Sequence, residues 1–424
     1  MLRPVLILLV LAVAGAGWFL LLRGDDSPAT YSPVNLRNDP WAYSAGREAE
    51  FESRAAAGHS HVIYTKSPGG IVATAARVAR WRPQVEAAAE ESGVDPDLIE
   101  GMVLLESAGR PDARASDDLD GAVGLTQILA QTATGLLGMQ VDVTRSERLT
   151  RKLERARSAR EAARIRAARA RVDERFDPDK SLAATGRYLK TAMDEFGRED
   201  LAVVSYHMGI GNLQQVLGAY GDDDASYAQL YFDASPDRQP RAYRLLAGLG
   251  DDSKTYFWRV LASREVMRLY RENRAKLERL AELQSGSDSG ELVLHPPDRT
   301  RSFETQEDVD NATADGELRP VGDGALRPEA YALLAYIRDG VRNVSGVKAP
   351  LTVTRTVRPA GGIHATGYAF DVSRTYANGR QAEAFQFMLD RLQALNVIAW
   401  TRDARTIHIT ASSEGRRILG ETGR

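Results

Sequence analysis

The chain has 424 residues, of which 55 are Lys or Arg and 58 are Asp or Glu, so its formal net charge is −3. A balance this close to neutral gives no general signature of nucleic-acid binding, and we expect no nucleic-acid partner. The length exceeds one ordinary hydrophobic core, so two domains with linkers are expected. The chain has no cysteine and therefore no disulfide framework, which is compatible with either redox compartment.

Residues 1–23 are predicted to form a membrane anchor or signal segment, because an almost unbroken apolar run extends from Val5 to Leu22. Eighteen residues rise about 27 Å as a helix, close to the roughly 30 Å hydrocarbon core of a bilayer. The small residues Ala14-Gly15-Ala16 lie in the middle of this run, which argues against cleavage there. We therefore favour a single-pass anchor in the inner (cytoplasmic) membrane, with the domains in the periplasm or extracytoplasmic space. A cleaved signal peptide is the alternative.

A mainly α-helical domain is predicted over residues 70–283. Residues 24–69, rich in Ser, Pro, Gly, Asp and Asn, precede it and suggest an extended extracytoplasmic tether. Asp95 is a suitable N-cap and Pro96 a suitable first residue for a helix that runs to Glu106. Further helical patterns cover 128–138, 180–196, 200–208 and 254–283, the last being a C-terminal helical extension of the domain.

A charged helical insertion interrupts this domain at residues 145–175, where twelve basic residues stand against five acidic ones. One interpretation is a basic arm that contacts an anionic wall polymer or lipid head groups. The other is a solvated helical insertion with many intrahelical charge pairs.

The last part of the chain reads as a linker and a small α+β domain. Residues 284–325 are polar and contain Gly, Ser, Pro and acidic residues, which predicts the interdomain linker. Within the domain, residues 326–424, we expect helices from Pro328 to Val341 and over 381–395. Strands are expected over 351–354, 368–372 and 406–410.

Glu106 is the first candidate catalytic residue. The apolar residues 102–105 would desolvate its carboxyl group and keep it protonated if that face is buried. Cleavage of a glycosidic bond needs such an acid, and ordinary glycosidases add a second carboxylate. Asp117, Asp118 and Asp120 follow, but the segment SDDLDG is more typical of a turn. The residues alone indicate a buried acid beside a polar loop.

Three blocks make this candidate specific: Glu106-Ser107, Gly124-Leu125-Thr126-Gln127-Ile128 and Ser205-Tyr206-His207-Met208-Gly209. In this order and spacing, within a helical domain, they resemble the soluble lytic transglycosylase family over roughly residues 70–235. The resemblance implies a goose-type lysozyme-like fold. It also implies cleavage of the MurNAc–GlcNAc bond in peptidoglycan glycan strands, without water or a cofactor, to leave anhydro-MurNAc ends.

Roles for single residues follow from the same resemblance. Glu106 would protonate the leaving oxygen and then act as a base, while the N-acetyl group of the substrate replaces a second carboxylate. Ser107 would orient Glu106 or the acetamido group, Gln127 would line the saccharide groove, and Tyr206 would lie over the acid.

Two positions depart from the family pattern. Thr126 stands where the family has methionine, which alters the packing of the groove. His207 stands where the family has asparagine, so a titratable side chain either contacts the substrate or donates a structural hydrogen bond.

A second constellation lies in the C-terminal domain, where the block from His364 to Asp371 reads HATGYAFD and His408 follows. Two histidines and an aspartate can supply three ligands and leave a fourth position for water, as a catalytic zinc ion needs. The block H-x-x-G-x-A-x-D resembles the zinc D-alanyl-D-alanine carboxypeptidase family over roughly residues 326–415. The resemblance implies that His364, Asp371 and His408 are metal ligands and that Arg355 or Arg358 holds a substrate carboxylate or carbonyl.

The match to this second family is incomplete. Arg405 stands where the family has a glutamate as general base, Gly362 replaces a serine, and Glu414 is a distant substitute at best. The sequence therefore predicts a lytic transglycosylase joined to a zinc-peptidase-like module whose peptidase activity is open. The alternatives are a zinc-dependent peptidoglycan peptidase that acts on stem peptides, and a non-catalytic scaffold that binds the cell wall.

Overall fold

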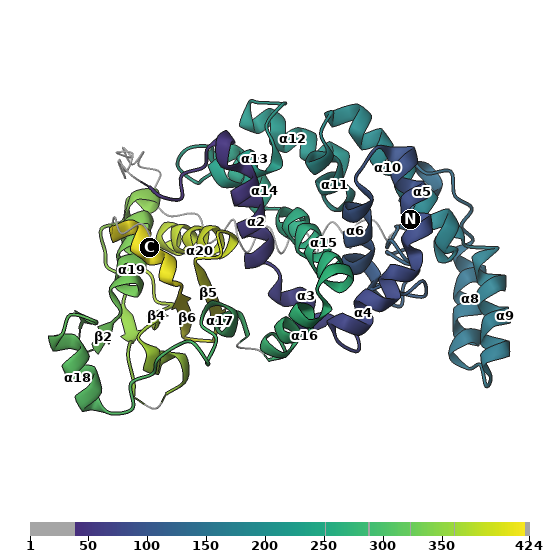
Figure 1. Ribbon diagram of the computed structural model, residues 1–424. Coiled ribbons are helices and arrows are strands. Elements are labelled where there is room, and N and C mark those ends of the chain that lie inside the picture. The colour runs from purple at the N-terminus through teal and green to yellow at the C-terminus, as the bar shows by residue number, and fades with distance from the viewer. Residues whose placement is uncertain (1–38, 251, 287–288, 323, 360, 420–424) are drawn as a thin grey trace. The chain divides into compact units, whose positions relative to one another are not determined.

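The computed structural model describes residues 39–250, 252–286, 289–322, 324–359 and 361–419 (Figure 1). Its contacts divide the chain into two compact units. The helical unit contains residues 43–234 and 239–293, and the mixed unit contains residues 294–419 together with 39–42 and 235–238. Among the described residues no helix is long and apolar enough to cross a membrane. The expected anchor at residues 1–23 lies outside them and stays a prediction.

The helical unit confirms the prediction of a mainly α domain. Its helices are α2 (Glu48–Gly58), α3 (His61–Lys66), α4 (Ile71–Val78), α5 (Arg82–Ser92), α6 (Pro96–Ser107), α7 (Ala130–Gly135), α8 (Val143–Glu154), α9 (Ala159–Ala170), α10 (Pro178–Phe196), α11 (Glu199–Met208), α12 (Ile210–Tyr220), α13 (Tyr227–Asp233), α14 (Pro240–Ala247), α15 (Tyr256–Glu272) and α16 (Arg274–Leu283). The short helix α17 (Ser289–Leu294) follows them.

Helix α15 is the central element of the helical unit (Figure 1). It packs against α2, α4, α6 and α11, and ten of its seventeen residues are buried. An amphipathic surface helix would show a narrower apolar stripe, so this pattern is that of a helix covered on most sides. Helices α5 and α10 form a second close pair, and together these contacts fix the ends of α6 and α11, on which the candidate site residues lie.

Part of the expected tether is folded, which corrects the prediction for residues 24–69. Helices α2 and α3 occupy 48–66, and Phe51, Ala55, Ile63 and Tyr64 are buried. The ring of Phe51 packs edge-on against Phe232, 4.9 Å away between centroids. The buried residues are two short pairs, Phe51 with Ala55 and Ile63 with Tyr64, in an otherwise polar segment. They are too few to give a helical hydrophobic period in the sequence, although each of them is buried in the fold.

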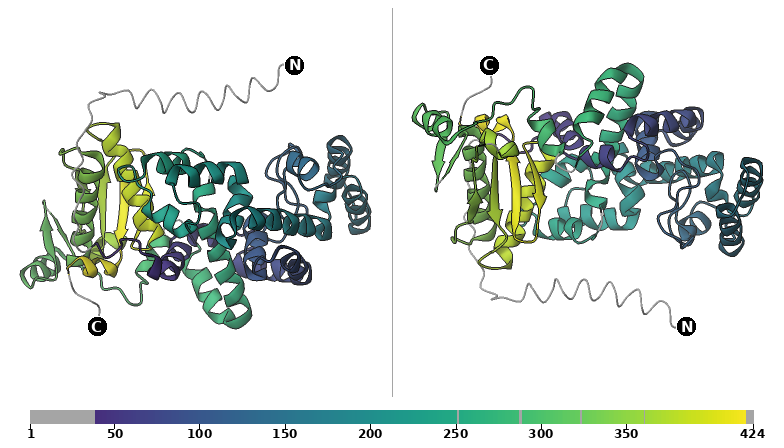
Figure 2. Two further views of the ribbon diagram at one scale, coloured as in Figure 1. Left: turned by 90° about the horizontal axis from the view of Figure 1, so that it is seen from above. Right: turned by 90° about the horizontal axis from the view of Figure 1, so that it is seen from below.

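The charged insertion forms a helical hairpin, with α8 and α9 side by side at one end of the helical unit (Figures 1 and 2). Asp142 caps α8 by accepting a hydrogen bond from the Arg145 amide, and Ser158 caps α9 through the Glu161 amide. Ser146, Thr150, Ile165 and Arg169 are buried in the hairpin. Its seam is therefore narrow and largely polar.

The mixed unit has a small antiparallel sheet and two longer helices, in agreement with the predicted α+β domain. The sheet has the order β3-β4-β6-β5. The elements are β3 (Val353–Arg355), β4 (Ala369–Ser373), β5 (Ile398–Arg402), β6 (Thr406–Ala411), α19 (Pro328–Ser345) and α20 (Gly379–Ala394). Helices α19 and α20 pack on each other and contact β6 and β5 respectively. Strand β5 was not predicted.

The segment 284–325, predicted to be a linker, is instead largely folded and joins the mixed unit from residue 294 onward. Its elements include α18 (Gln306–Ala314), β1 (Arg319–Val321) and the start of β2 (Gly324–Leu326). Thr305 and Asp308 form a reciprocal capping box at the start of α18. A small core of Phe303, Val309, Ala312, Leu318 and Ala325 stabilises this segment. Its few apolar residues are spread among many polar ones, which hides the core from a composition-based reading.

Candidate functional site

Glu106 lies in the last turn of helix α6. Asp95 caps the start of the helix by accepting a hydrogen bond from the Asp97 amide, and Pro96 is the first helical residue, as predicted. At the other end Ala108 and Gly109 have φ values of 54° and 73°. A Cβ atom on Gly109 would lie 2.8 Å from the Val78 amide nitrogen, so only glycine fits this turn. The chain therefore leaves the helix directly after Glu106 and Ser107.

The carboxyl group of Glu106 is held in a poorly solvated place. The hydroxyl of Tyr256 donates a hydrogen bond to Glu106 Oε1 at 2.7 Å. Desolvation raises the pKa of Glu106 to about 7, although the Tyr256 hydrogen bond and the charge of Arg259 both lower it. Near neutral pH the group is therefore present in both protonation states, as a residue that first donates and then accepts a proton requires.

A close helix crossing brings Tyr256 to Glu106. Tyr256 is the first residue of α15. A Cβ atom on Gly101 of α6 would lie 2.8 Å from the Val260 carbonyl oxygen of α15, so the absence of a side chain at Gly101 sets the separation of the two helices. Tyr256 was missed by sequence reasoning, because it stands 150 residues from its partner and belongs to none of the three sequence blocks.

The predicted supports of Glu106 are only partly gathered around it. Ser107 is buried and its hydroxyl donates to the Val103 carbonyl of its own helix at 3.2 Å; its role in orienting Glu106 or the acetamido group stays a prediction. Gln127 has a φ of 52° and its side-chain amide donates to the Gly124 carbonyl at 2.8 Å. That bond ties the loop to itself.

Tyr206 does lie beside the acid. Burial and then the charge of Glu106 are the two leading causes that raise the pKa of the Tyr206 phenol. Its hydroxyl donates to the Thr126 carbonyl at 2.8 Å, and its ring packs edge-on against Tyr188. Tyr206 thus connects the acid to the loop that carries Gln127.

His207 contacts Ser253 and Tyr256. Its Nδ1 atom lies 2.8 Å from the Ser253 hydroxyl, and its ring stacks on Tyr256 with centroids 5.0 Å apart. The ring is also exposed, so both of the roles predicted for it, structural donor and substrate contact, stay compatible with its place.

Arg175 holds the loop of residues 119–128 in place through hydrogen bonds to its backbone. The guanidinium of Arg175 donates to the carbonyl oxygens of Leu119 at 2.7 Å, Gly121 at 3.0 Å and Ile128 at 3.3 Å. It also pairs with Asp173 at 2.9 Å, and both side chains have no exposed surface. These two residues were read as members of a charged insertion, whereas they form the buried support of the Gln127 loop.

Among the described residues, no second carboxylate contributes to the pKa shift of Glu106. Asp118 accepts a hydrogen bond from the Asp120 amide at 2.9 Å, as a turn residue does. Asp117 is fully exposed and faces Arg114 at 3.8 Å. Among the described residues, only Tyr256 and Arg259 join desolvation in shifting the pKa of Glu106. Among the described residues, the site therefore combines one carboxyl group of raised pKa with the phenols of Tyr206 and Tyr256.

The comparison with protein families agrees with this class of enzyme. Residues 153–229 match the family described as Transglycosylase SLT domain. The matched segment holds Tyr206 and His207 and begins after Glu106 and Gln127. The match indicates an enzyme with lytic transglycosylase activity on peptidoglycan.

The second constellation is assembled by the sheet of the mixed unit. Strand register pairs Arg355 with Asp371 and Asp371 with His408, so the three side chains lie in one row across the sheet. The next positions on β4 and β6, among them Phe370 and Ile409, point to the other face and are buried. His364 comes from a 3₁₀ turn over Gly362–Thr366, directly before β4.

The predicted metal ligands do come together. One ligand atom from each of His364, Asp371 and His408 lies within 4.8 Å of the others. His408 Nδ1 lies 2.7 Å and His364 Nε2 3.2 Å from the same Asp371 oxygen. Burial lowers the pKa of His364, which favours the neutral ring that binds a metal ion.

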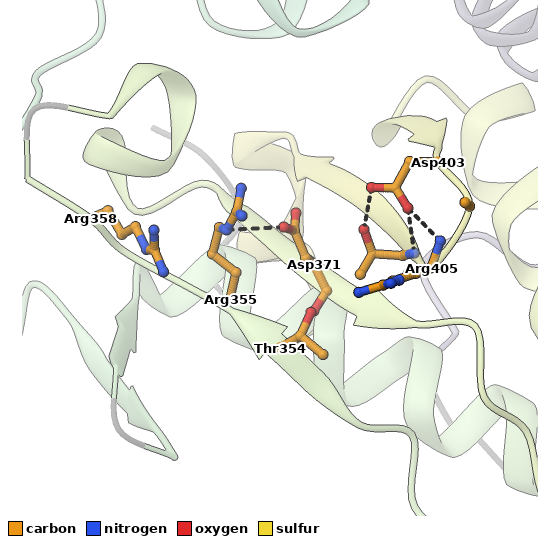
Figure 3. Close-up of a pocket in the computed structure, with 8 residues that line it drawn as sticks. Thr354, Arg355, Arg358, Asp371, Asp403 and Arg405 are labelled. Atoms are coloured by element: carbon orange, nitrogen blue, oxygen red, sulfur yellow. Dashed lines mark hydrogen bonds and ion pairs between the residues drawn. The ribbon is translucent and has the colours of Figure 1, made fainter.

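A pocket of about 480 Å³ adjoins this cluster and is rich in arginine. Figure 3 shows Arg355 and Arg405 on either side of Asp371. Arg355 pairs with the second oxygen of Asp371 at 3.3 Å. Arg358 also lines the pocket, and the expectation that Arg355 or Arg358 holds a substrate carboxylate or carbonyl stays a prediction. The chemistry offered here is that of an anion-binding pocket beside a cluster of potential metal ligands.

The pocket contains one further carboxylate, which the local turn already uses. Asp403 accepts hydrogen bonds from the amides of Arg405 and Thr406 at 2.6 and 2.7 Å and from the Thr406 hydroxyl at 2.7 Å (Figure 3). These bonds lower the pKa of Asp403 to about 2. Glu414, the distant substitute, pairs with Arg417 at 2.7 Å. With its lowered pKa and three hydrogen bonds, Asp403 is a poor general base near neutral pH.

Proposed function

We propose that the helical unit cleaves the MurNAc–GlcNAc bond of peptidoglycan and leaves anhydro-MurNAc ends, with Glu106 as general acid and then base. The observation that carries the proposal is the raised pKa of Glu106, about 7, at a carboxyl group fixed by Tyr256. Tyr256 binds Oε1, and we assign the proton transfers to the other oxygen, Oε2.

The reaction that fits these groups has two proton transfers. Protonated Glu106 gives its proton to the glycosidic oxygen while the C1–O bond breaks, and the acetamido oxygen of the same sugar bonds to C1. The Glu106 carboxylate then removes the proton of the sugar's C6 hydroxyl, whose oxygen attacks C1 and displaces the acetamido oxygen. No second protein carboxylate is needed, in accord with the surroundings of Glu106.

The test is digestion of purified sacculi by the full-length protein, with soluble products identified by mass spectrometry. The parent protein should release muropeptides with anhydro ends, and the Glu106→Gln variant should release none above background. Glu91→Gln, the same change at an exposed position of α5, is the matched control and should behave like the parent. Unchanged release by Glu106→Gln would contradict the role of this residue. Binding of sacculi by the parent without any product would favour a scaffold.

We propose, as a second function, that His364, Asp371 and His408 bind one Zn²⁺ ion in the mixed unit. Three potential ligand atoms, one from each residue, lie within 4.8 Å of one another, which favours a metal site. In addition, neither ring nitrogen of the buried His364 has a hydrogen-bond partner in good geometry within the described residues. A bound ion would supply Lewis-acid chemistry at its fourth position. Because Arg405 replaces the expected base, we propose binding of wall peptides rather than their hydrolysis.

Metal analysis tests this second proposal directly. The full-length protein, loaded with Zn²⁺ and passed over a desalting column, should retain about one ion per chain, and His364→Ala should retain far less. Incubation with cross-linked muropeptides should give no free D-alanine. Equal metal content in both proteins would contradict the site, whereas chelator-sensitive release of D-alanine would show a peptidase.

A further inference from the structure

Arg175 uses all of its hydrogen-bonding capacity on one loop and one acid. A guanidinium has five N–H groups in a fixed fork. Here they meet five acceptors, which are the carbonyl oxygens of Leu119, Gly121 and Ile128 and the two carboxylate oxygens of Asp173. Neither charged side chain has any exposed surface. An ammonium group, with three donors on a flexible stem, cannot reproduce this set.

The main chain beside Arg175 also approaches the loop. Gly124 has a φ of 84°, and a Cβ atom at this position would collide with the Arg175 carbonyl oxygen. Only glycine therefore fits where the loop crosses residue 175. Leu119 and Val123 pack with Phe176, the next residue, in one small apolar cluster. Polar and apolar contacts thus shape the loop on the same short segment.

Gln127 is the residue of this loop that can meet a ligand. Among residues 123–128 it alone is not buried. Its side-chain nitrogen donates to a carbonyl of the loop itself, and its side-chain oxygen has no hydrogen-bond partner among the described residues. The loop also adjoins the acid. The Thr126 carbonyl accepts the hydrogen bond of Tyr206, and the charge of Glu106 acts on the Tyr206 phenol. A shift of the loop would therefore move a free acceptor near Glu106.

The α8–α9 hairpin contributes to the same support. Asp173 follows α9, and its Oδ2 atom accepts a hydrogen bond from the Ser146 hydroxyl of α8 at 2.8 Å. The Asp142 amide, directly before α8, donates to the Val172 carbonyl at 2.7 Å. Ser146 has no exposed surface. The two ends of the hairpin thus meet at the carboxylate that orients Arg175.

We propose that Arg175 is a positioning residue for the glycan substrate, because it keeps the loop of residues 119–128 in the shape that presents Gln127 to the sugar. Asp173 and Ser146 act through Arg175. This inference deepens the proposed transglycosylase function and rests on it. Without the guanidinium, three carbonyl oxygens lose their donor at once, and the loop must shift to satisfy them.

The first comparison uses two buried arginines of the same region. Arg175→Lys removes the fork and keeps the charge, and Arg169→Lys is the matched control. Arg169 pairs with Asp112, donates to Thr150 and forms no hydrogen bond to the loop among the described residues. Its cation also lies over the ring of Phe176, and lysine keeps a cation there.

A milder pair of changes covers the case in which Arg175→Lys does not fold. Ser146→Ala removes a hydroxyl that donates to Asp173. Thr150→Val removes a hydroxyl about one turn further along α8 that accepts from Arg169. Both hydroxyl residues are buried, so the two changes differ mainly in whether the lost hydrogen bond leads to Arg175.

Two measurements on the full-length chain separate positioning from stability. The affinity for soluble glycan strands is measured with each change in the Glu106→Gln background, so that the ligand is not consumed. The rate of anhydro-product formation is measured over a range of strand concentrations with Glu106 intact. Thermal unfolding of every variant sets a temperature at which all the compared proteins are folded.

Arg175→Lys should bind the strands about tenfold more weakly than Arg169→Lys, since a displacement of about 1 Å can cost on the order of a hundredfold. KM should rise by a similar factor while kcat changes little, which is the pattern of lost substrate binding. Ser146→Ala should bind about threefold more weakly than Thr150→Val, the size of one hydrogen bond. The pH–activity profile should keep its position, because Tyr256 is untouched.

Equal strand affinity of Arg175→Lys and Arg169→Lys, both folded, would overturn the inference. A loss of kcat at unchanged KM and affinity would do the same. If Arg175→Lys does not fold, equal affinity of Ser146→Ala and Thr150→Val overturns it. Failure of the proposed function looks different: the protein with intact Glu106 then forms no anhydro product, while the affinity difference within each pair persists.

Discussion

Helix α6 carries two glutamates, Glu100 near its middle and Glu106 in its last turn, and their surroundings are opposite in character. Glu100 is 1% exposed and pairs with the guanidinium groups of Arg82, at 3.3 Å, and Arg271. Glu106, less than two turns further on, forms no ion pair with any described residue and accepts a hydrogen bond from the neutral Tyr256. The comparison teaches that burial alone does not make a carboxyl group an acid catalyst. Glu100 has two guanidinium partners, whereas Glu106 has a neutral phenol and a pKa raised to about 7 by desolvation.

Removing the charge of Glu100 should have the largest effect, and it should fall on stability. Glu100→Gln leaves Arg82 and Arg271 without the carboxylate between them, which should lower the free energy of unfolding by roughly 3 kcal/mol. Activity per folded molecule should be kept. Denaturant unfolding and a sacculus-digestion assay at low temperature measure the two quantities. A folded Glu100→Gln protein without activity would break the contrast between the two glutamates.

Glu106→Gln should change stability in the opposite direction, and only at higher pH. The pKa of Glu106 is raised in the fold from 4.5 to about 7, so ionisation of Glu106 destabilises the parent as pH rises from about 4.5 to 7. Below this range parent and variant should be equally stable. Above it the variant should be more stable, by on the order of 2–3 kcal/mol. Unfolding curves at pH 4 and pH 8 provide the check, and a pH-independent difference would sink the assignment of the raised pKa.

Gly101→Ala tests the close crossing of α6 and α15, which brings Tyr256 to Glu106. The new methyl group would meet the Val260 carbonyl at 2.8 Å, so α6 and α15 must separate, at a cost of about 1–3 kcal/mol. The same shift moves Tyr256 from Glu106 and should lower kcat. Gly218→Ala in α12, where nothing lies within 4 Å, is the control and should be neutral or slightly stabilising. Equal behaviour of both variants would contradict the close crossing.

Tyr256→Phe should produce the smallest change. The Tyr256 hydrogen bond lowers the pKa of Glu106, so its loss should raise that pKa. The alkaline limb of the pH–activity profile should then move upward by up to about one unit. Tyr270→Phe on the same helix is the control and should leave the profile unchanged. A downward shift in Tyr256→Phe would mean that the hydroxyl does not stabilise the carboxylate.

The local features of the first site could be predicted from sequence. Asp95, Pro96 and the apolar run fix the start and direction of α6, and they place Glu106 at its last turn through interactions within a dozen residues. The sequence also allowed the prediction that Asp371 and His408 lie together, because side chains alternate along a strand and this decides which residues share a face of the sheet. In both cases the information is local, and backbone geometry carries it.

Partners from distant segments could not be predicted. Arg175 and Asp173 look like surface charges by residue type, and only the carbonyl oxygens of a loop some fifty residues earlier explain their burial. The roles of Ser107 and Gln127 were expected from a resemblance, and the structure shows that their polar groups bond to their own helix and loop. Short apolar sets such as Phe303 and Leu318 gave no periodic signal, so the linker prediction failed.

The position of Tyr256 in the chain bears on when the site can exist. A chain that has emerged as far as residue 229, the end of the family match, has Glu106 and Tyr206 but not α15. Its acid then lacks both the phenol that fixes its orientation and the helix whose packing covers α6. The reactive carboxyl group is thus completed by one of the last helices of its unit to be synthesised, and such long-range closure is slow compared with local helix formation. The fold itself delays the assembly of a wall-cleaving site until almost the whole helical unit is present.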